Sequence, residues 1–451
     1  MGIRALILFG ILLPCVPFCF FSPNLGVLIW SIIAFASPQW YAWGAAFTLP
    51  VAELVAIPTL LGFVVFSRGW GRLLCREAIL LMIFWIWTVI TSINAANTPL
   101  FQSHADMTWF RLQGVSKIFL MTLVTIGIVD SFARLRTLII VMAGCFSFYV
   151  VKALPFMITS AGAYRLYGPP RSAVEDNNDL GLALNMTLPL LLFLAQAETN
   201  PKAKRIFWFL FFILIPGIFC TYSRGALVGL VVVMGLMFMR LKQRAILFPA
   251  MAVAIIIAVL FAPEQWKVRM NLTNKEATLD MSAHSRINAW TFAWNLAKDY
   301  PIAGGGFDTF QRDLFDRYAP NTKDVHGPHS IYFGVLGEHG WVGFAIYMTL
   351  VWSCFSTLGK VMRWARFHGD EIADHYAKML QFSIIAFLTS GLFLGRQYFD
   401  YFMTLVACVA ILKRSCMVSW NRDHQLVTGE PLFGDAELED KPQVEVPSGI
   451  R

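Results

Sequence analysis

Charged side chains are scarce in this sequence. Asp, Glu, Lys and Arg make up 14% of its 451 residues, whereas hydrophobic residues make up 57% and the mean hydropathy is +0.60. Soluble domains carry about 25% charged residues, so the chain lacks the polar surface of a soluble enzyme, a disordered protein or a nucleic-acid-binding protein. Its net charge of +8 is better explained by orientation in a membrane than by binding to nucleic acid.

The sequence also lacks a cysteine framework. None of its eight cysteines forms a C-x-x-C pair, which argues against a zinc or redox motif. Most of them lie inside apolar runs. The first apolar run is interrupted by Pro14 and Pro17 and no A-x-A site follows it, so we do not expect a cleavable signal peptide.

Long apolar runs are abundant instead. A membrane-spanning helix needs about 20 mostly apolar residues. The runs are approximately Ala5–Phe21, Leu25–Ser37, Phe47–Phe66, Ala78–Ile93, Ile118–Val129, Leu138–Val151, Leu180–Ala195, Ile206–Thr221, Ala226–Met239, Ala245–Phe261, Trp341–Ser356, Met379–Leu394 and Phe402–Leu412. They predict an all-α fold, a polytopic helical bundle in a membrane.

Basic residues between these runs predict the orientation. They cluster in alternate connections: Arg68, Arg72 and Arg76; Arg134 and Arg136; Lys202, Lys204 and Arg205; Arg240, Lys242 and Arg244; Lys360, Arg363 and Arg366; Lys413 and Arg414. The positive-inside rule makes these connections cytoplasmic. The first 66 residues leave two alternatives, an even number of crossings with Arg4 inside or three crossings with Arg4 outside. We favour the first, for about twelve spans in total rather than about thirteen.

This map divides the chain into four parts: transmembrane helices at 1–262, a long periplasmic loop at 263–329, C-terminal transmembrane helices at 330–414 and a disordered cytoplasmic tail at 415–451. Loops as long as 263–329 are uncommon without a function. Inside the loop, Trp290, Ala293, Trp294 and Ala297 recur at helical spacing. Pro301, followed by three glycines, ends that predicted helix. An amphipathic helix lying on the membrane surface is the simpler explanation of the tryptophans.

Arg224 lies where the positive-inside rule disfavours arginine. It follows an apolar run and opens the next span on the predicted outer face. With Ser223 as the helix N-cap, nearby backbone N–H groups and the guanidinium would point together at an anion. The alternative is an interfacial arginine whose charge extends into water.

Three histidines mark the place where the long loop re-enters the membrane. His326, His329 and His339 do not have the spacing of a zinc motif, so we assign no metal. One histidine at a membrane–water boundary suits general-base catalysis. A purely structural hydrogen-bonding role is the alternative for each of them.

An acidic segment, residues 175–179, ends the first outward loop. Its carboxylates Glu175, Asp176 and Asp179 suit a divalent cation. The alternative is that Asn178 or Asp179 caps the next helix.

In this order, the motifs resemble the O-antigen ligase/polymerase family of bacterial envelope glycosyltransferases. The resemblance extends from about Asn177 to Gly343. It rests on Ser223-Arg224-Gly225-Ala226, Arg286…Trp290, Pro301…Gly304-Gly305-Gly306-Phe307…Phe310, His329-Ser330 and Glu338-His339-Gly340…Gly343. Leu13-Pro14-Cys15-Val16-Pro17-Phe18 and the segment from Arg165 to Asp179 resemble a narrower branch, the O-glycosylation ligase associated with the exosortase A system.

The resemblance implies a membrane glycosyltransferase of the GT-C type, inverting and without a metal or other cofactor. Its donor would be a glycan on undecaprenyl diphosphate, and its acceptor a lipid or protein hydroxyl at the periplasmic face. The resemblance places Arg224 and Arg286 on the diphosphate and His329 beside the acceptor hydroxyl, with His326 and His339 as competing candidates. Arg165, Glu338 and Asn178 are candidate substrate-binding residues.

Three alternatives stay open at this stage. A polysaccharide polymerase of the same family shares the donor and the motifs. A lipid-linked oligosaccharide flippase or other transporter would show internal repeats and ionisable residues in mid-span. A structural membrane protein would leave Arg224, Arg286 and His329 unexplained. An enzyme should bring these three side chains together.

Overall fold

The computed structural model describes residues 3–42, 49–66, 69–239, 266–267, 278–428 and 432. Within these ranges the chain is helical and contains no strand. The run expected at Ala245–Phe261, the first part of the long loop and the tail beyond residue 432 lie outside the described residues.

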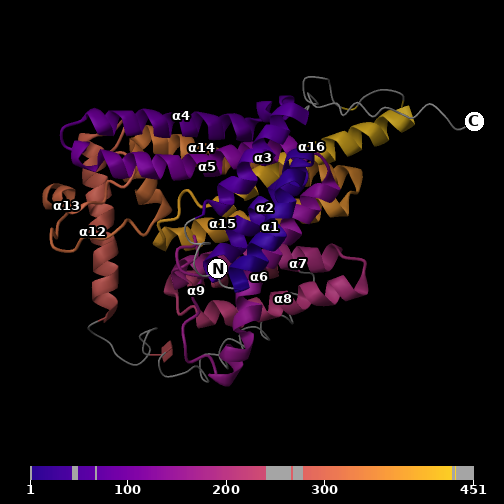
Figure 1. Cartoon of the computed structure of the whole chain (residues 1–451), viewed down its shortest axis with the longest axis horizontal. Coiled ribbons are helices and arrows are strands. Elements are labelled where there is room, and N and C mark those ends of the chain that lie inside the picture. The colour runs from indigo at the N-terminus through magenta and orange to yellow at the C-terminus, as the bar shows by residue number, and fades with distance from the viewer. Residues whose placement is uncertain are drawn as a thin grey trace, which may run out of the picture.

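Nine helices in the described ranges are long and apolar enough to span a membrane. They are α1 (Ile3–Phe21), α4 (Arg76–Asn97), α5 (Ala105–Ile128), α6 (Phe132–Thr159), α7 (Asn177–Ala197), α8 (Pro201–Cys220), α14 (Ile331–His368), α15 (Glu371–Ser390) and α16 (Asp400–Thr428). Three shorter apolar helices accompany them, α2 (Pro23–Ala36), α3 (Val51–Phe66) and α9 (Arg224–Met239). The predicted all-α polytopic fold is confirmed, and Figure 1 shows the long helices side by side.

Helix α7 occupies the centre of the bundle. Every side chain from Leu180 to Ala195 is buried, and the helix packs against α8, α9 and α15. The amide nitrogen of Asn185 donates to the Ala226 carbonyl at 2.7 Å and to the Ser390 hydroxyl at 3.2 Å. A buried polar side chain thereby fixes α7 against both α9 and α15.

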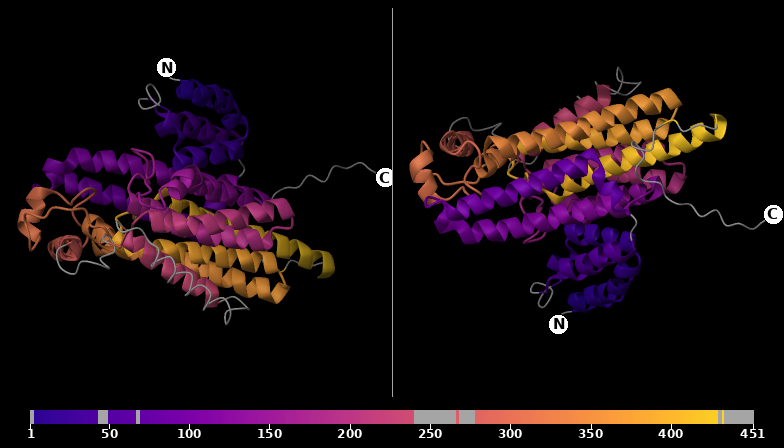
Figure 2. Two further views of the ribbon diagram at one scale, coloured as in Figure 1. Left: turned by 90° about the horizontal axis from the view of Figure 1, so that it is seen from below. Right: turned by 90° about the horizontal axis from the view of Figure 1, so that it is seen from above.

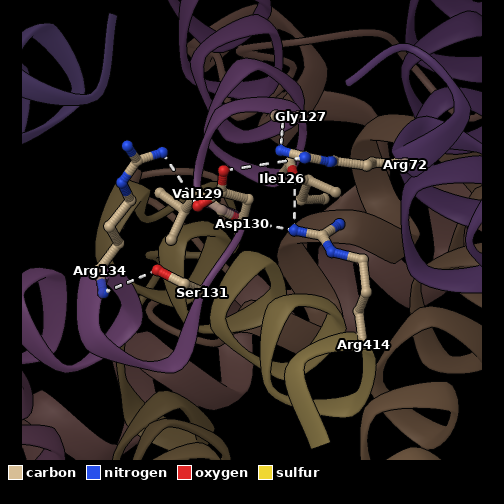
Figure 3. Close-up of polar contacts among 8 residues, drawn as sticks. All are labelled: Arg72, Ile126, Gly127, Val129, Asp130, Ser131, Arg134 and Arg414. Atoms are coloured by element: carbon tan, nitrogen blue, oxygen red, sulfur yellow. Dashed lines mark hydrogen bonds and ion pairs between the residues drawn. The ribbon is translucent and has the colours of Figure 1, made fainter. Parts of the chain in front are cut away.

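One end of the bundle, called here the basic end, gathers arginines from distant connections (Figure 3). Arg72 donates to the Gly127 carbonyl at 2.9 Å, and Arg414 donates to the carbonyls of Ile126, at 3.2 Å, and Val129. The last carbonyls of a helix have no partner within the helix. The two guanidinium groups therefore satisfy the C-terminal end of α5 and complement its dipole.

The α5–α6 connection adds a third arginine to the basic end. Asp130 accepts a hydrogen bond from Arg134 at 2.9 Å and lies 3.8 Å from the Arg72 guanidinium. Three of the connections that we predicted to be cytoplasmic thus lie together, as the alternation of charge requires.

The opposite end, called here the loop end, carries α12 (Thr278–Asp299) and α13 (Arg312–Tyr318). Figure 1 shows both helices at the end of the bundle away from the last turns of α16. His104, before α5, joins Asp313 of α13 at 2.8 Å.

The first three helices differ from the arrangement that we favoured. They form a group beside the main bundle, as Figure 2 shows. The rings of Phe20 and Phe21, where α1 ends, pack against Phe66 at the end of α3. Tyr41, just after α2, lies at the opposite end, where its ring centroid is 3.6 Å from the Lys152 ammonium of α6. The three helices therefore alternate in direction, which agrees with three early crossings and not with the even number that we favoured.

Helix α12 is not an isolated helix on the membrane surface. It buries one apolar face, formed by Ala289, Phe292, Ala293, Leu296 and Ala297, and packs against α13 and α14. The Trp290 indole donates to the Pro328 carbonyl at 2.8 Å and stacks on Phe333, which belongs to α14. The helical spacing was predicted correctly, but the face it creates packs on protein.

Helix α14 is interrupted at Gly340, whose φ of 66° and ψ of −170° are non-helical. The Trp341 amide, freed by this kink, donates to the Pro301 carbonyl at 2.8 Å. A Cβ atom at position 340 would lie 2.5 Å from the carbonyl oxygen of Ile302. Only glycine fits both the conformation and the close approach.

The glycine segment after Pro301 completes this contact. The amides of Gly305 and Gly306 donate to the carbonyls of Gly337 and Glu338, each at 2.9 Å. The loop segment and the kinked helix are therefore joined by backbone hydrogen bonds, and this junction fixes the long loop on the bundle.

Candidate active site

The α8–α9 turn presents Arg224 at the loop end. Tyr222 adopts a left-handed φ of 56°, and the Ser223 hydroxyl accepts a hydrogen bond from the Ala226 amide at 3.1 Å. Ser223 is thus the N-cap that we expected. Arg224, the first residue of α9, is half-buried and makes no hydrogen bond or ion pair with any residue that the structure describes. Its guanidinium remains available to a ligand.

The connection between α15 and α16, residues 391–399, lies under this turn. A Cβ atom at Gly225 would lie 3.2 Å from the Cβ of Phe393. The guanidinium carbon of Arg286, on α12, is 5.8 Å from the centroid of the Phe393 ring, within cation–π range. Gly225, the neighbour of Arg224, and the Arg286 side chain therefore contact the same phenylalanine, although residues 224 and 286 are 62 positions apart in the chain.

His329 reaches the same connection from the long loop. It is exposed, has a left-handed φ of 40° and precedes Ser330, the N-cap of α14. A Cβ atom at Gly395 would lie 3.5 Å from the His329 backbone nitrogen. Residues 393–395 therefore contact Gly225 next to Arg224, the Arg286 guanidinium and the His329 backbone, so the structure brings together the three segments that carry these residues.

Charges around His329 favour its neutral form. Partial removal from solvent lowers its pKa below the ordinary value, and the positive charges of Arg286 and His326 lower it further. The carboxylates of Asp179 and Asp176 act in the opposite direction. Since the net shift is downward, the imidazole is neutral at pH 7 and able to accept a proton.

The acidic segment is divided among three separate tasks. Asp176, and not Asn178 or Asp179 as we expected, is the N-cap of α7 and accepts hydrogen bonds from the Asn178 backbone and side-chain nitrogens, both at 2.8 Å. Glu175 accepts from the Arg171 amide at 2.7 Å, and Asp179 pairs with Arg396. In the ranges that the structure covers, no three His, Cys, Asp or Glu side chains are grouped as metal ligands would be.

Arg165 lies beside the α8–α9 turn. Its guanidinium carbon is 5.9 Å from the centroid of the Tyr222 ring, and the next residue, Leu166, donates its amide to the Cys220 carbonyl at 2.8 Å. The side chain is exposed. It is therefore placed next to Arg224, as a second cation at the same turn.

Glu338 is buried below these residues. Its carboxylate accepts from the Gln397 amide at 2.9 Å, the Tyr398 hydroxyl at 2.7 Å and the Asp308 backbone at 3.2 Å. All of these partners are protein groups, two of them in the α15–α16 connection. Glu338 thus supports the connection from below and is not gathered with Arg224.

The other two histidines are placed differently from His329. His339 is fully buried, with Nδ1 2.7 Å from the Thr91 hydroxyl, and packs against Phe307. His326 is half-exposed and pairs with Asp324 at 2.7 Å. His339 meets the α15–α16 connection from inside the bundle, where its ring packs edge-on against Tyr398, whereas His329 meets it at Gly395.

Sequence reasoning missed Phe393, Gly395 and Arg396. Phe393 and Gly395 belong to no motif, and nothing in the sequence shows which residues they contact. Arg396 did carry a signal, since it stands in a connection that the charge alternation places on the outer side, the criterion that singled out Arg224.

Two family models match this chain, and one of them includes the three candidate catalytic residues. The family model of the O-antigen ligases matches residues 209–348, which include Arg224, Arg286 and His329. A family of unknown function, DUF5935, matches residues 3–199. No curated protein matches the chain. The family resemblance seen in the sequence is confirmed, whereas the narrower exosortase-associated branch stays a prediction.

Proposed function

We propose the following reaction from the match between residues 209–348 and the family model of the O-antigen ligases. The protein transfers a glycan from undecaprenyl diphosphate to an acceptor hydroxyl at the periplasmic face of the bacterial inner membrane. One observation carries the proposal: the segments that bear Arg224, Arg286 and His329 meet at residues 393–395, at the loop end and away from the basic end.

The two arginines suit a diphosphate leaving group. As the bond between the anomeric carbon and the phosphate oxygen breaks, negative charge grows on that oxygen. Guanidinium groups bind phosphate oxygens in pairs and stabilise this charge. Among the described residues Arg224 makes no hydrogen bond or ion pair, so its guanidinium suits binding to the donor. With the charge held by arginines, the transfer needs no metal ion.

His329 suits the acceptor side of the reaction. Its neutral imidazole takes the proton of the acceptor hydroxyl while the oxygen attacks the anomeric carbon. The proton ends on His329, the new glycosidic bond forms and undecaprenyl diphosphate leaves. Attack from the face opposite the leaving group inverts the anomeric configuration.

A polymerase of the same family would use the same donor and the same three residues. It would differ in the acceptor, which would be a second lipid-linked glycan. We favour a ligase, because the matching family is that of O-antigen ligases. The resemblance of residues 165–179 to the O-glycosylation branch favours a protein Ser or Thr hydroxyl among the ligase acceptors.

Reconstitution tests this function directly. The purified protein in proteoliposomes receives an undecaprenyl-diphosphate-linked glycan and, in separate reactions, a lipid acceptor, a Ser/Thr-containing protein acceptor or no added acceptor. Transfer to one added acceptor, lost in Arg224→Ala and His329→Ala, supports a ligase. Chain growth without an added acceptor identifies a polymerase. Glycan movement across the bilayer with no transfer contradicts the proposal.

A further inference from the structure

An ion pair joins the support of the site to the central helix. Asp179, in the first turn of α7, binds Arg396 of the α15–α16 connection. Their side chains are only 10% and 30% exposed. The family matches place Asp179 and Arg396 differently: Asp179 lies in the segment of unknown function, and Arg396 lies outside both matches.

This pair adjoins the contact that holds His329. Gly395, against which the His329 backbone packs, is the residue before Arg396. Two residues earlier, Phe393 lies under Arg286 and beside Gly225. Anchoring Arg396 therefore holds this short stretch most directly at Gly395, the residue on which the His329 backbone rests.

The far side of the connection is anchored as well. Gln397 and Tyr398 are both held by the Glu338 carboxylate of α14. The connection is thus clamped between α7, through Asp179, and α14, through Glu338. Of the two anchoring carboxylates, Asp179 is the one whose negative charge acts on the His329 imidazole. Asp176 of α7 acts on it in the same direction.

We propose that the Asp179–Arg396 ion pair is a positioning device for His329, holding residues 393–395 so that the imidazole stays aligned with the acceptor hydroxyl. The inference rests on the proposed function, because alignment matters only if His329 takes part in the reaction. A misplacement of about 1 Å in a reacting group costs about 10²-fold in rate. Losing the pair should therefore lower kcat strongly and change donor affinity little.

The chain contains a matched control for this pair. Arg136 and Glu198 form a second ion pair that touches the other end of α7, with side chains 41% and 9% exposed. It lies at the basic end, far from the candidate residues. Neutral double variants of both pairs avoid a buried unpaired charge, which would itself destabilise the fold.

The experiment compares three preparations with the unaltered protein: Asp179→Asn with Arg396→Gln, Arg136→Gln with Glu198→Gln, and the first pair of substitutions in a His329→Ala background. We expect the first to lose about 10- to 100-fold in kcat at little change in donor KM. The control should keep its kcat. In the His329→Ala background, the same substitutions should not lower kcat further, because an alanine has no imidazole for the ion pair to position.

A spectroscopic readout separates positioning from general support. In histidine-labelled protein, the NMR signal of His329 is identified by its absence from His329→Ala. Replacing Asp179 alone by Asn removes a negative charge that favours the imidazolium, so the titration of His329 should shift to lower pH. An unmoved titration, or an undiminished loss of kcat in the His329→Ala background, overturns the inference. Near-normal transfer by His329→Ala alone would overturn the proposed function instead, and the titration would still decide whether the pair acts on His329.

Discussion

The guanidinium carbon of Arg286 lies 5.8 Å from the centre of the Phe393 ring. This contact joins the long loop to the connection between the last two helices. Because Gly225 also packs on Phe393, one aromatic residue links the two segments that carry the arginines we assign to the diphosphate.

The arginines should not tolerate lysine. A compact ammonium cannot contact two phosphate oxygens in the plane that a guanidinium offers. We expect Arg224→Lys and Arg286→Lys each to lower transfer by about 10²–10³-fold, as loss of a charge-stabilising donor does. Glycan transfer by reconstituted protein is the measurement. Arg312→Ala, an exposed arginine on α13, is the control and should be near normal. Full activity in Arg224→Lys would show that charge alone suffices.

The pH profile should report His329. Transfer requires the neutral imidazole, so the rate falls as pH drops through the pKa of His329. Since removal from solvent, Arg286 and His326 lower that pKa, the acid limb should have its midpoint below about 6.5, the ordinary value for histidine. His329→Ala should lose about 10²–10⁴-fold and lack this limb, whereas His326→Ala should keep it. An unchanged limb in His329→Ala would assign the base elsewhere.

The kink in α14 should depend on glycine at position 340. Its φ and ψ belong to a region that is strained by about 1–3 kcal/mol for other residues, and a Cβ would also meet the Ile302 carbonyl. Gly340→Ala should therefore lower the melting temperature in detergent and weaken transfer. Gly359→Ala, on the same helix with nothing within 4 Å of its Cβ position, should leave both unchanged or raise the melting temperature.

The two ends of the bundle should face opposite compartments. His326 is half-exposed at the loop end and Lys202 is exposed next to Arg205 in a basic connection. In a cysteine-free background, a membrane-impermeant maleimide applied from the periplasm should label His326→Cys but not Lys202→Cys until the membrane is opened. The reverse pattern would contradict both the orientation and the proposed reaction.

Chelators should leave the reaction intact. Glu175, Asp176 and Asp179 each have their own protein partner, and the proposal assigns the diphosphate charge to arginines. Transfer in excess EDTA should match transfer without it. A loss restored by Mg²⁺ or Mn²⁺ would show that a divalent cation replaces or assists the arginines.

Hydropathy predicted most of the helices, because burial in a bilayer demands long apolar runs whatever the tertiary structure. It misjudged where α5 and α14 begin. The expected run Ile118–Val129 stops short of Lys117, which lies inside the longer α5. The Lys117 ammonium pairs with the Glu53 carboxylate of α3 at 2.7 Å. Polar residues that find partners within the bundle lower the local hydropathy without ending the helix.

The residues themselves pointed to the site only at the outer boundary. Arg224 was recognisable because the positive-inside rule disfavours arginine there, and His329 because a boundary imidazole suits a general base; Arg286 was identified only through the family resemblance. Phe393 and Gly395 carry no such signal, and their roles depend on which segments meet in three dimensions. The helix cap was assigned to Asn178 or Asp179 although Asp176 serves it, because several neighbouring residues have equal capping ability.

The position of the support near the C-terminus of the chain has a consequence for biogenesis. Ribosomes deliver the helices in order, so Arg224, Arg286 and His329 enter the membrane before residues 393–399 have been made. Until α15 and α16 are inserted, Arg286 has no phenylalanine beneath it and His329 has no connection to rest on. If the proposed reaction is correct, a nascent or prematurely terminated chain lacks this support and should not consume lipid-linked glycan before the final hairpin is inserted.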